Sequence, residues 1–534
     1  MQYKNSKFSI YTPIVLALVL AAGIFLGSRL NYNSNSGEIN FKLERNKIDL
    51  IIDLIESDYV DSVDKNEIVE NTIPYLLENL DPHSVYISAK DLQQVNEPLE
   101  GNFDGIGVQF NLLNDTILVI NTISGGPSEK IGILAGDKII MIDDSLFAGV
   151  NITNNDVIKN LKGPRGTEVK VSIAREGFSE LLDFVITRDE IPLYSLDVAY
   201  MITDEVAYVK ISAFARTTHD EFITAVEMLK KSGMKKIILD LRGNGGGYLD
   251  AAINIADEFL ENEEMIVYTQ GKSRPRSENL ATDKGSLENN EVVILIDSWS
   301  ASASEIVAGA IQDNDRGLII GRRSFGKGLV QEPTMFRDGS ALRLTIARYY
   351  TPSGRCIQKS YSNGHEAYNH EWIDRYENGE MENADSTIFA DSLKYYTKAG
   401  KVVYGGGGIM PDIFVPMDTV GYTSYFREVS QKALIYSFAL NYTDKHRAQL
   451  ENFTDYRQIV KHLDQTDVFE QFLKYAKSKG VKKRPEEIAI SKKLIKTQIK
   501  AYIARNIIDN EGYYPIIKDI DKILLKAVDL ISGE

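Results

Sequence analysis

An alternation of apolar strands with amphipathic helices between about residues 194 and 416 constrains the fold most. The predicted strands read VAYVKIS, KIILDLR, VVILID and LIIG, and helices are predicted at 219–231, 249–260 and about 303–312. Strands and helices that alternate in this way are typical of an α/β core. A polar, acidic, Tyr-rich stretch at 361–395 interrupts the pattern and predicts a surface insertion.

The segments on either side of this core have different patterns. Residues 101–188 contain short alternating strands broken by glycine, which predicts a small β-rich domain. Apolar residues recur at helical spacing before it and again after Asp418. At roughly 150 residues per domain, a chain of 534 residues should form several units. We therefore divide it into a signal segment, an N-terminal helical region, the β-rich domain, the α/β core and a C-terminal helical region, at 1–30, 31–100, 101–188, 189–417 and 418–534.

The first thirty residues resemble an export signal. Lys4 and Lys7 precede an apolar run from Ile14 to Leu26, and Arg29 follows it. The run is short for a membrane span of about 20 residues, yet no clear small-x-small cleavage site follows. An anchor in the inner membrane and a cleaved signal peptide both remain open. Either one predicts that the rest of the chain lies in the periplasm.

Amino-acid composition argues against some classes of binding partner and some classes of catalytic residue. A net charge of -16 without a cluster of Lys and Arg argues against nucleic-acid binding. Cys356 is the only cysteine, so an intramolecular disulfide is impossible, and its polar surroundings favour an incidental thiol over a nucleophile. We expect neither a cofactor nor a metal site.

The segment SWSASASEIVAGAIQD is a candidate site for a serine nucleophile. A predicted strand ends at Asp297 and a helix follows the serine-rich turn. Such a turn exposes a hydroxyl and directs backbone N–H groups at its surroundings. Ser302 and Glu305 also form an S-x-x-E capping box, so the same residues could serve only to start a helix. This segment alone leaves both interpretations open.

The segment LDLRGNGGGYLD is a candidate for an oxyanion-binding loop. Its glycines allow the backbone to approach a substrate closely. A phosphate-binding loop is the alternative, but the segment lacks the Lys and Ser/Thr of a P-loop and the G-x-G-x-x-G spacing. Amide donors for an oxyanion therefore fit better.

The segment GRRSFGKGLVQ carries a candidate base. Lys327 lies between two glycines, and Gln331 follows four residues later, on the same face if this segment is a strand. A lysine abstracts a proton only when neutral, so burial must lower its pKa from about 10.4 toward 7 or 8. Gln331 could then accept a hydrogen bond from the amine. A solvated lysine in a turn is the alternative.

Taken together, these segments resemble the carboxy-terminal processing, or tail-specific, serine proteases, whose core is related to the ClpP and crotonase-like folds. The resemblance also rests on LDPHSVY, FDGIGV, RYYTPSGRCIQ and GGGGIMPDI, and it covers about residues 41–417. It implies a serine endopeptidase with Ser302 as nucleophile, Lys327 as general base and Gln331 as its assisting residue. It further implies that the amides of Gly246 and Ala303 bind the oxyanion. Trp299 stands where the family usually has Asn.

The β-rich domain resembles the PDZ domain of such proteases, in the order GIGV followed by PSEKIGILAGDKII. Convergent amides at Gly105, Ile106, Gly107 and Val108 could bind the carboxylate of a free peptide C-terminus, although GIG alone also fits a plain tight turn. The expected partners are therefore protein or peptide substrates with free C-termini. Self-association into a homo-oligomer remains open.

Two other function classes remain as alternatives. One is a catalytically silent PDZ scaffold or chaperone of the same fold, and the presence of Ser302, Lys327 and Gln331 together argues against it. The other is a Ser-His-Asp hydrolase. None of the six histidines lies in a segment that the core pattern places beside Ser302. We expect His83 in LDPHSVY to be structural, because no partner acid is specified near it.

Overall fold

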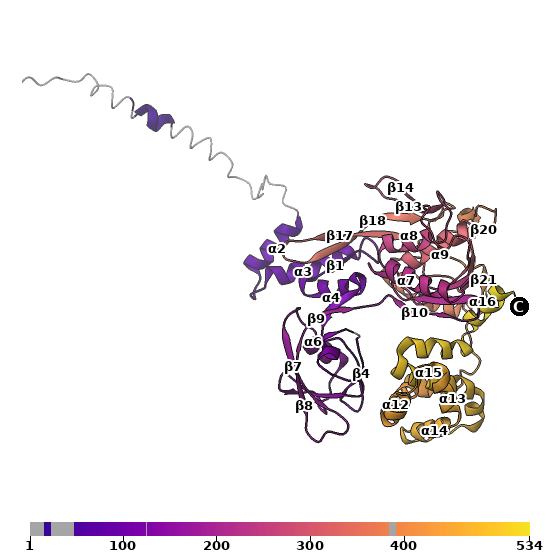
Figure 1. The fold of residues 1–534 in the computed structure, drawn as a ribbon. Helices are drawn as coiled ribbons and strands as arrows, with labels where there is room; N and C mark the ends of the chain where they lie inside the picture. Colours follow the sequence, from indigo (N-terminus) through magenta and orange to yellow (C-terminus); the bar gives the residue numbers. More distant parts are fainter. Residues whose placement is uncertain (1–14, 16, 23–46, 124, 384–390, 534) are drawn as a thin grey trace, which may run out of the picture. The chain divides into compact units, whose positions relative to one another are not determined.

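The computed structural model describes residues 15, 17–22, 47–123, 125–383 and 391–533 (Figure 1). They divide into two units between Ile73 and Pro74. The first contains α2 (Lys47–Asp58), and α3 (Lys65–Leu77) crosses the boundary. Lys4, Lys7, Arg29 and most of the predicted export signal lie outside the described residues. Within the described part of the chain, no helix has both the length and the apolar character needed to cross a membrane.

A six-stranded sheet forms the centre of the α/β core (Figure 1). Its strands in spatial order are β10 (Leu196–Met201), β11 (Val206–Ile211), β12 (Lys236–Asp240), β15 (Glu291–Ile296), β16 (Leu318–Gly321) and β21 (Ile413–Phe414). β10 and β11 are antiparallel, and the other neighbouring pairs are parallel. Parallel strands are buried on both faces, which explains the continuous apolar run of β15.

Helices cover both faces of this sheet. α7 (Thr218–Lys231), α8 (Leu249–Asp257) and α9 (Ala303–Asp313) share an apolar core with one face, and α16 (Lys522–Ser532) packs on the other. Because successive strand residues point to opposite faces, Ile237 lies in the first of these cores, while Ile238 packs with Ile523 and Leu524. The last helix of the chain thus completes the α/β core.

A second sheet brings distant segments to the same place. It contains β1 (Val85–Ile87), β18 (Ala341–Tyr350), β13 (Met265–Gln270) and β14 (Ser277–Leu280), with β17 (Leu329–Met335) paired to β18. Val85 of β1 is opposite Arg343 of β18, and Gln331 of β17 is opposite Thr345. The LDPHSVY segment is therefore held beside the strand that follows Lys327.

The β-rich domain has its own sheet and core. The sheet contains β3 (Val108–Leu112), β4 (Ile117–Thr122), β5 (Lys138–Ile142), β7 (Glu168–Ala174) and β8 (Leu182–Thr187), with β6 (Ser145–Leu146) paired to β5; its helices are α5 (Pro127–Lys130) and α6 (Asn154–Leu161). β3 lies at the edge of this sheet. The two chain connections to the domain, β2 (Asn102–Gly105) and β9 (Asp189–Pro192), pair with one another as an antiparallel ribbon.

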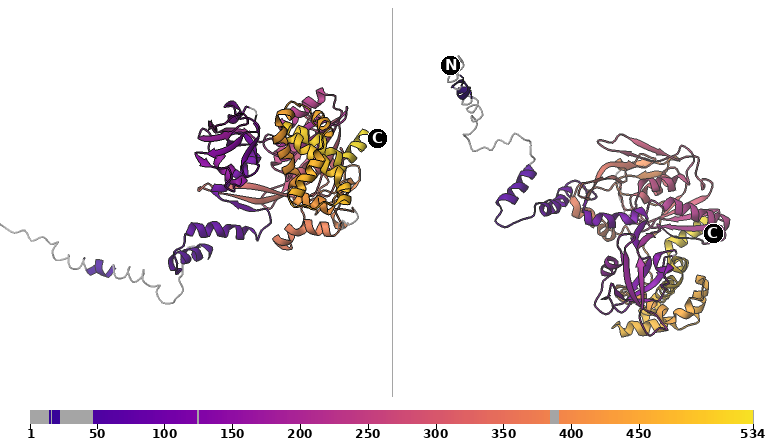
Figure 2. Two further views of the ribbon diagram at one scale, coloured as in Figure 1. Left: turned by 90° about the horizontal axis from the view of Figure 1, so that it is seen from below. Right: turned by 60° about the vertical axis from the view of Figure 1, so that its left-hand side comes forward.

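The C-terminal helices before α16 share a further apolar core. Figure 2 shows these helices in two views of the ribbon. They are α11 (Ser424–Gln431), α12 (Leu434–Leu450), α13 (Tyr456–Asp464), α14 (Val468–Ser478), α15 (Pro485–Ile517) and the short η3 (Lys518–Ile520). Non-helical dihedral angles at Ile508 and Asp509 kink α15.

Two smaller elements complete the surroundings of the site. α4 (Ala89–Glu100) precedes the β-rich domain. In the segment expected to be an insertion, the structure has α10 (Gly364–Glu377), η2 (Asp391–Leu393) and β19 (Lys394–Tyr396), which pairs with β20 (Val402–Tyr404). α10 buries Tyr368 and Arg375, so this helix packs against the rest of the unit.

Candidate active site

A cavity of about 760 Å³ lies where the three chemistry-bearing segments meet. Its lining includes residues 245–247 of the glycine loop, Ser302 and Ala303 at the start of α9, and Lys327 and Gln331 beside β17. Residues of α4 and β18 complete the wall. The fold thus brings together five predicted site residues that span 86 positions of the chain, from Gly246 to Gln331.

Ser302 is on the sharp turn between β15 and α9. Its backbone has φ 56° and ψ -114°, a conformation that is strained for a residue with a side chain. The glycine loop approaches it closely, because a Cβ added to Gly246 would lie 2.7 Å from the Ser302 Cβ and 2.9 Å from the Ala301 carbonyl oxygen. Only glycine allows this approach.

The two backbone amides that are expected to bind the oxyanion differ in their hydrogen bonds. Gly246 N–H donates to Asn244 Oδ1 at 2.8 Å. Ala303 N–H has no hydrogen-bond acceptor within the part of the chain that the structure describes. The Ala303 amide is therefore available to an oxyanion as it stands, whereas the Gly246 amide would first have to exchange its partner.

Lys327 and Gln331 form a hydrogen-bonded pair. Lys327 Nζ donates to Gln331 Oε1 at 3.1 Å, and Gln331 Nε2 donates to the His83 carbonyl oxygen. The second bond fixes the amide so that its oxygen faces the amine. Ser302 and Lys327 line the same cavity, and among the described residues no hydrogen bond joins Ser302 Oγ to Lys327 Nζ.

The surroundings of Lys327 favour its neutral form. Burial is the largest cause that lowers the pKa of its amine, and the positive charge of Arg343 acts in the same direction. The carboxylates of Glu305 and Asp81 oppose both. Desolvation destabilises the charged ammonium, so this buried lysine is a better base than a solvated one.

Glu305 is a structural link that the sequence did not single out beyond its capping role. It is fully buried, and its carboxylate accepts bonds from the backbone N–H groups of both Ser302 and Lys327, each at 2.9 Å. Ser324 Oγ and Gly326 N–H donate to its other oxygen. Burial raises the pKa of this carboxyl to about 7. The bond from Ser302 N–H to Glu305 is one half of the predicted capping box, and the same carboxylate also connects the turn of the candidate nucleophile Ser302 to the segment that carries Lys327.

The alternative nucleophile and bases lie elsewhere. His83 does not line the cavity; its ring lies against Tyr368, and burial lowers its pKa to about 4. His219 Nε2 is 2.9 Å from Glu258 Oε1, also away from the cavity lining. Burial raises the pKa of the Cys356 thiol, which disfavours the reactive thiolate. In the described residues no group of His, Cys, Asp and Glu is arranged to hold a metal ion.

The GIGV loop lies between β2 and the edge strand β3. Gly107 has φ +74°, and the carbonyl groups of Ile106 and Gly107 accept bonds from Ser128 and Ile123 inside the domain. The Ile106 side chain is buried in the domain core, while Val108 is only partly buried. An edge strand that begins at such a loop can accept an extended peptide as an added strand.

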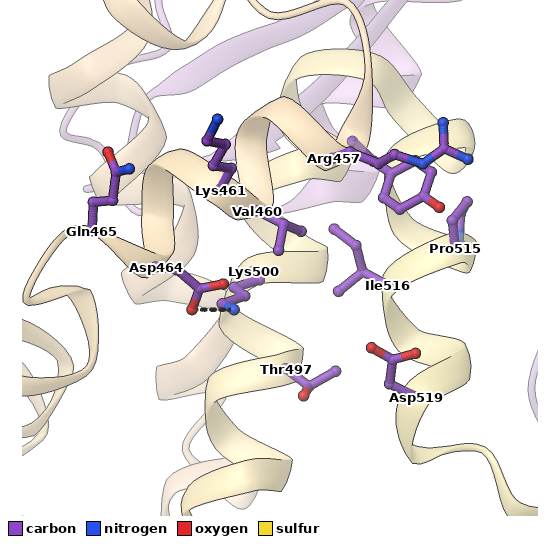
Figure 3. A pocket seen from close by; sticks show the side chains of 11 residues that line it. Arg457, Val460, Lys461, Asp464, Gln465, Thr497, Lys500, Pro515, Ile516 and Asp519 are labelled. Carbon is purple, nitrogen blue, oxygen red and sulfur yellow. Dashed lines mark hydrogen bonds and ion pairs between the residues drawn. The ribbon is translucent and has the colours of Figure 1, made fainter.

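A second cavity, of about 510 Å³, lies in the C-terminal helical region (Figure 3). α13 and α15 supply most of its lining. Asp464 in its wall pairs with Lys496 and Lys500. We assign no chemistry to this cavity.

Comparison with known families matches three parts of the chain. The model described as peptidase family S41 matches residues 205–365, and a PDZ domain model matches residues 105–184. A family of unknown function, DUF8443, matches residues 425–509.

Individual relatives agree with these matches. The carboxy-terminal-processing protease of Bartonella bacilliformis is 35% identical over 350 residues, which cover 64% of this chain and 80% of that protein. The carboxy-terminal processing protease CtpA of Bacillus subtilis is 31% identical over 328 residues, covering 61% and 68%. Among solved structures, the photosystem II D1 C-terminal processing protease is 23% identical and covers 70% of this chain and 87% of its own, with a TM-score of 0.37. Together with the structure, the family matches confirm the predicted fold class.

Proposed function

The chain belongs to the carboxy-terminal processing proteases of peptidase family S41, and from this premise we propose that it cleaves exported proteins near their C-termini with a Ser302–Lys327 dyad. One observation carries the assignment of residues: Ser302, Lys327, Gln331 and the candidate oxyanion donors line the same cavity. The alternative of a catalytically silent scaffold would not require a buried lysine beside a strained serine.

The proposed reaction begins with neutral Lys327. Its Nζ takes the proton of Ser302 Oγ while the oxygen attacks the scissile carbonyl carbon. Ala303 N–H, joined by Gly246 N–H once it has left Asn244, stabilises the resulting oxyanion. Lys327 then gives the proton to the leaving amine as the C–N bond breaks. Water then attacks the acyl carbon and gives a proton to Lys327, and the Lys327 ammonium returns this proton to Ser302 Oγ as the ester bond breaks and the acid product leaves.

Before this reaction, Lys327 Nζ has to come within hydrogen-bonding distance of Ser302 Oγ, a bond that the described residues do not show. We propose that binding of a substrate tail to the PDZ domain favours the competent arrangement, a population shift that requires the tail to bind that state more tightly. The loop from Gly105 to Val108 would bind the terminal carboxylate through its amides, while β3 pairs with the preceding residues. Val108 would contact the last side chain.

The test compares one unfolded substrate carrying an apolar C-terminus in its free and amidated forms. Because amidation removes the negative charge that the loop amides would bind, we expect the amidated form to bind roughly tenfold more weakly and to be cleaved correspondingly more slowly. Calorimetry measures binding to the Ser302→Ala protein, and mass spectrometry of the products measures the rate and site of cleavage. Equal binding and equal cleavage of the two forms would exclude carboxylate recognition. Absence of cleavage in both would favour the scaffold.

We also propose a periplasmic location for the catalytic region, supported by the charged and apolar pattern from Lys4 to Arg29. In fractionated cells that express the whole chain, the catalytic region is expected outside the inner membrane, either in the membrane fraction or released. Sequencing of the mature N-terminus distinguishes an anchor from a signal peptide cleaved near residue 30. Recovery of the full-length chain in the cytosol would contradict the proposal.

A further inference from the structure

α10 carries a buried tyrosine, Tyr368, whose neighbour His83 is bonded to Gln331. Tyr368 is 4% exposed, and its ring packs edge-on against His83 and Phe325. Lys359 Nζ lies 4.1 Å from the ring centroid. Tyr368 does not line the substrate cavity, and it lies beyond the residues that match the peptidase family model.

The Tyr368 hydroxyl has a polar partner in the ring of His83, because it lies 2.7 Å from His83 Nε2. Burial holds the pKa of the His83 ring well below its ordinary value, so the imidazole is neutral near pH 7 and can accept at Nε2. The hydroxyl can therefore donate a hydrogen bond to His83.

His83 leads directly to the proposed catalytic pair. Its carbonyl oxygen accepts from Gln331 Nε2, which leaves Gln331 Oε1 facing Lys327 Nζ. The contact between Tyr368 and His83 thus helps to set the amide that receives the lysine amine.

The turn that carries His83 is itself held firmly. The Asp81 carboxylate accepts from the backbone N–H groups of His83 and Ser84, and Thr345 Oγ1 on β18 also donates to it. The His83 carbonyl is therefore fixed from the side of the second sheet, and its ring is fixed by Tyr368. The contact of Tyr368 with the His83 ring is therefore what α10 adds to the support of this turn.

We propose that Tyr368 is a positioning residue for the Lys327–Gln331 pair, acting through His83; the inference rests on the proposed role of Lys327 as the base. Lysine has a flexible four-carbon stem, so its amine needs an external acceptor to hold it in place. A Gln331 amide that loses its fixed carbonyl partner can turn over and present its N–H₂ group to Lys327. In that arrangement the Gln331 N–H₂ group and the Lys327 ammonium are both donors, so the amine loses the acceptor that held it in place.

The test is Tyr368→Phe in the full chain, which removes the hydroxyl and keeps the ring packing. We expect kcat for an unfolded protein substrate to fall about tenfold, because small displacements of a catalytic group cost up to about 10²-fold. KM should stay within about twofold, since Tyr368 does not touch substrate. Tyr376→Phe is the matched control, because Tyr376 is on the same helix and 56% exposed; its kinetics should equal the wild type.

A double-mutant cycle separates positioning from general destabilisation. In a Gln331→Ala background, Tyr368→Phe should lower kcat much less than it does in the wild type, because the amide that it helps to orient is gone. His83→Leu removes the same ring contact from the other side and should also lower kcat. Circular dichroism melts show whether Tyr368→Phe and His83→Leu are folded at the assay temperature. One folded variant of the two suffices for the test.

The outcomes distinguish this inference from the proposed function. Wild-type kinetics for a folded Tyr368→Phe, or the same loss with and without Gln331, would overturn the positioning role while leaving the dyad intact. Activity retained by Lys327→Arg would instead remove the base on which both proposals rest. A loss confined to KM would assign Tyr368 to substrate binding and also overturn the inference.

Discussion

Ser302→Ala is expected to lose about 10⁴- to 10⁶-fold in kcat, because the proposed acyl-enzyme forms on the hydroxyl that this change removes. Binding of a tail peptide should be unchanged, since Ser302 lies outside the PDZ domain. Cleavage of an unfolded protein by the purified variant measures the loss. A fluorophosphonate reagent should label the wild type at Ser302, as located by fragment mass spectrometry, and should leave Ser302→Ala unlabelled.

The neighbouring serines provide matched controls. Ser300 Oγ donates to the Leu241 carbonyl oxygen, and Ser304 Oγ donates to the Asn244 carbonyl oxygen. Both hydroxyls therefore support the glycine loop from inside the protein. Ser300→Ala and Ser304→Ala should lower the free energy of unfolding by about 1 to 3 kcal/mol and keep measurable turnover and labelling.

Ser302 also begins α9, so loss of its hydroxyl could cost up to about 2 kcal/mol of stability. The unfolding transition of Ser302→Ala must therefore be measured alongside its activity. Near-wild-type cleavage by this variant would exclude Ser302 as nucleophile. Labelling that persists in it would identify another serine.

The sequence was sufficient to place the candidate nucleophile on the right kind of element. Ser302 follows an apolar strand and precedes a helix, and this local pattern predicts the turn that β15 and α9 form. Lys327 is followed by β17, which carries Gln331; the lysine itself lies outside the strand, so the two side chains meet without sharing a strand face as the spacing had suggested. The prediction for Ser302 succeeded because it depends on residues close in the chain.

Contacts between distant segments could not be predicted in the same way. The bond from Gln331 to the His83 carbonyl joins residues 248 positions apart, and strand periodicity does not specify which distant strands pair. The return of α16 to the central sheet is of the same kind. Glu305 was visible as a capping residue, but its bond to the Lys327 backbone depends on the fold that brings the two turns together.

Activity should rise with pH as the Lys327 ammonium loses its proton. Because burial and Arg343 lower the pKa of this amine, the neutral fraction at any given pH is larger than for a solvated lysine, and the rising limb of kcat/KM should lie below pH 10.5. Glu305, with a pKa raised to about 7, ionises over part of the same range and opposes the shift, so the limb reports a coupled titration. A limb near pH 4 would instead point to His83.

Lys327→Arg should lose at least about 10²- to 10⁴-fold in kcat across the whole pH range, the contribution that a general base makes. Guanidinium keeps a positive charge and hydrogen-bond donors in the site but cannot release a proton at accessible pH, so the rising limb should also disappear. Lys398→Arg is the control, because Lys398 is exposed and pairs with Glu264; its profile should match the wild type. Arg343→Gln tests the contribution of the Arg343 charge to the lowered pKa of Lys327. Removing that positive charge should move the rising limb to higher pH, with Lys327 still present as the base. A Lys327→Arg enzyme that retained both its rate and its limb would show that the proton of Ser302 goes to a group other than the Lys327 amine.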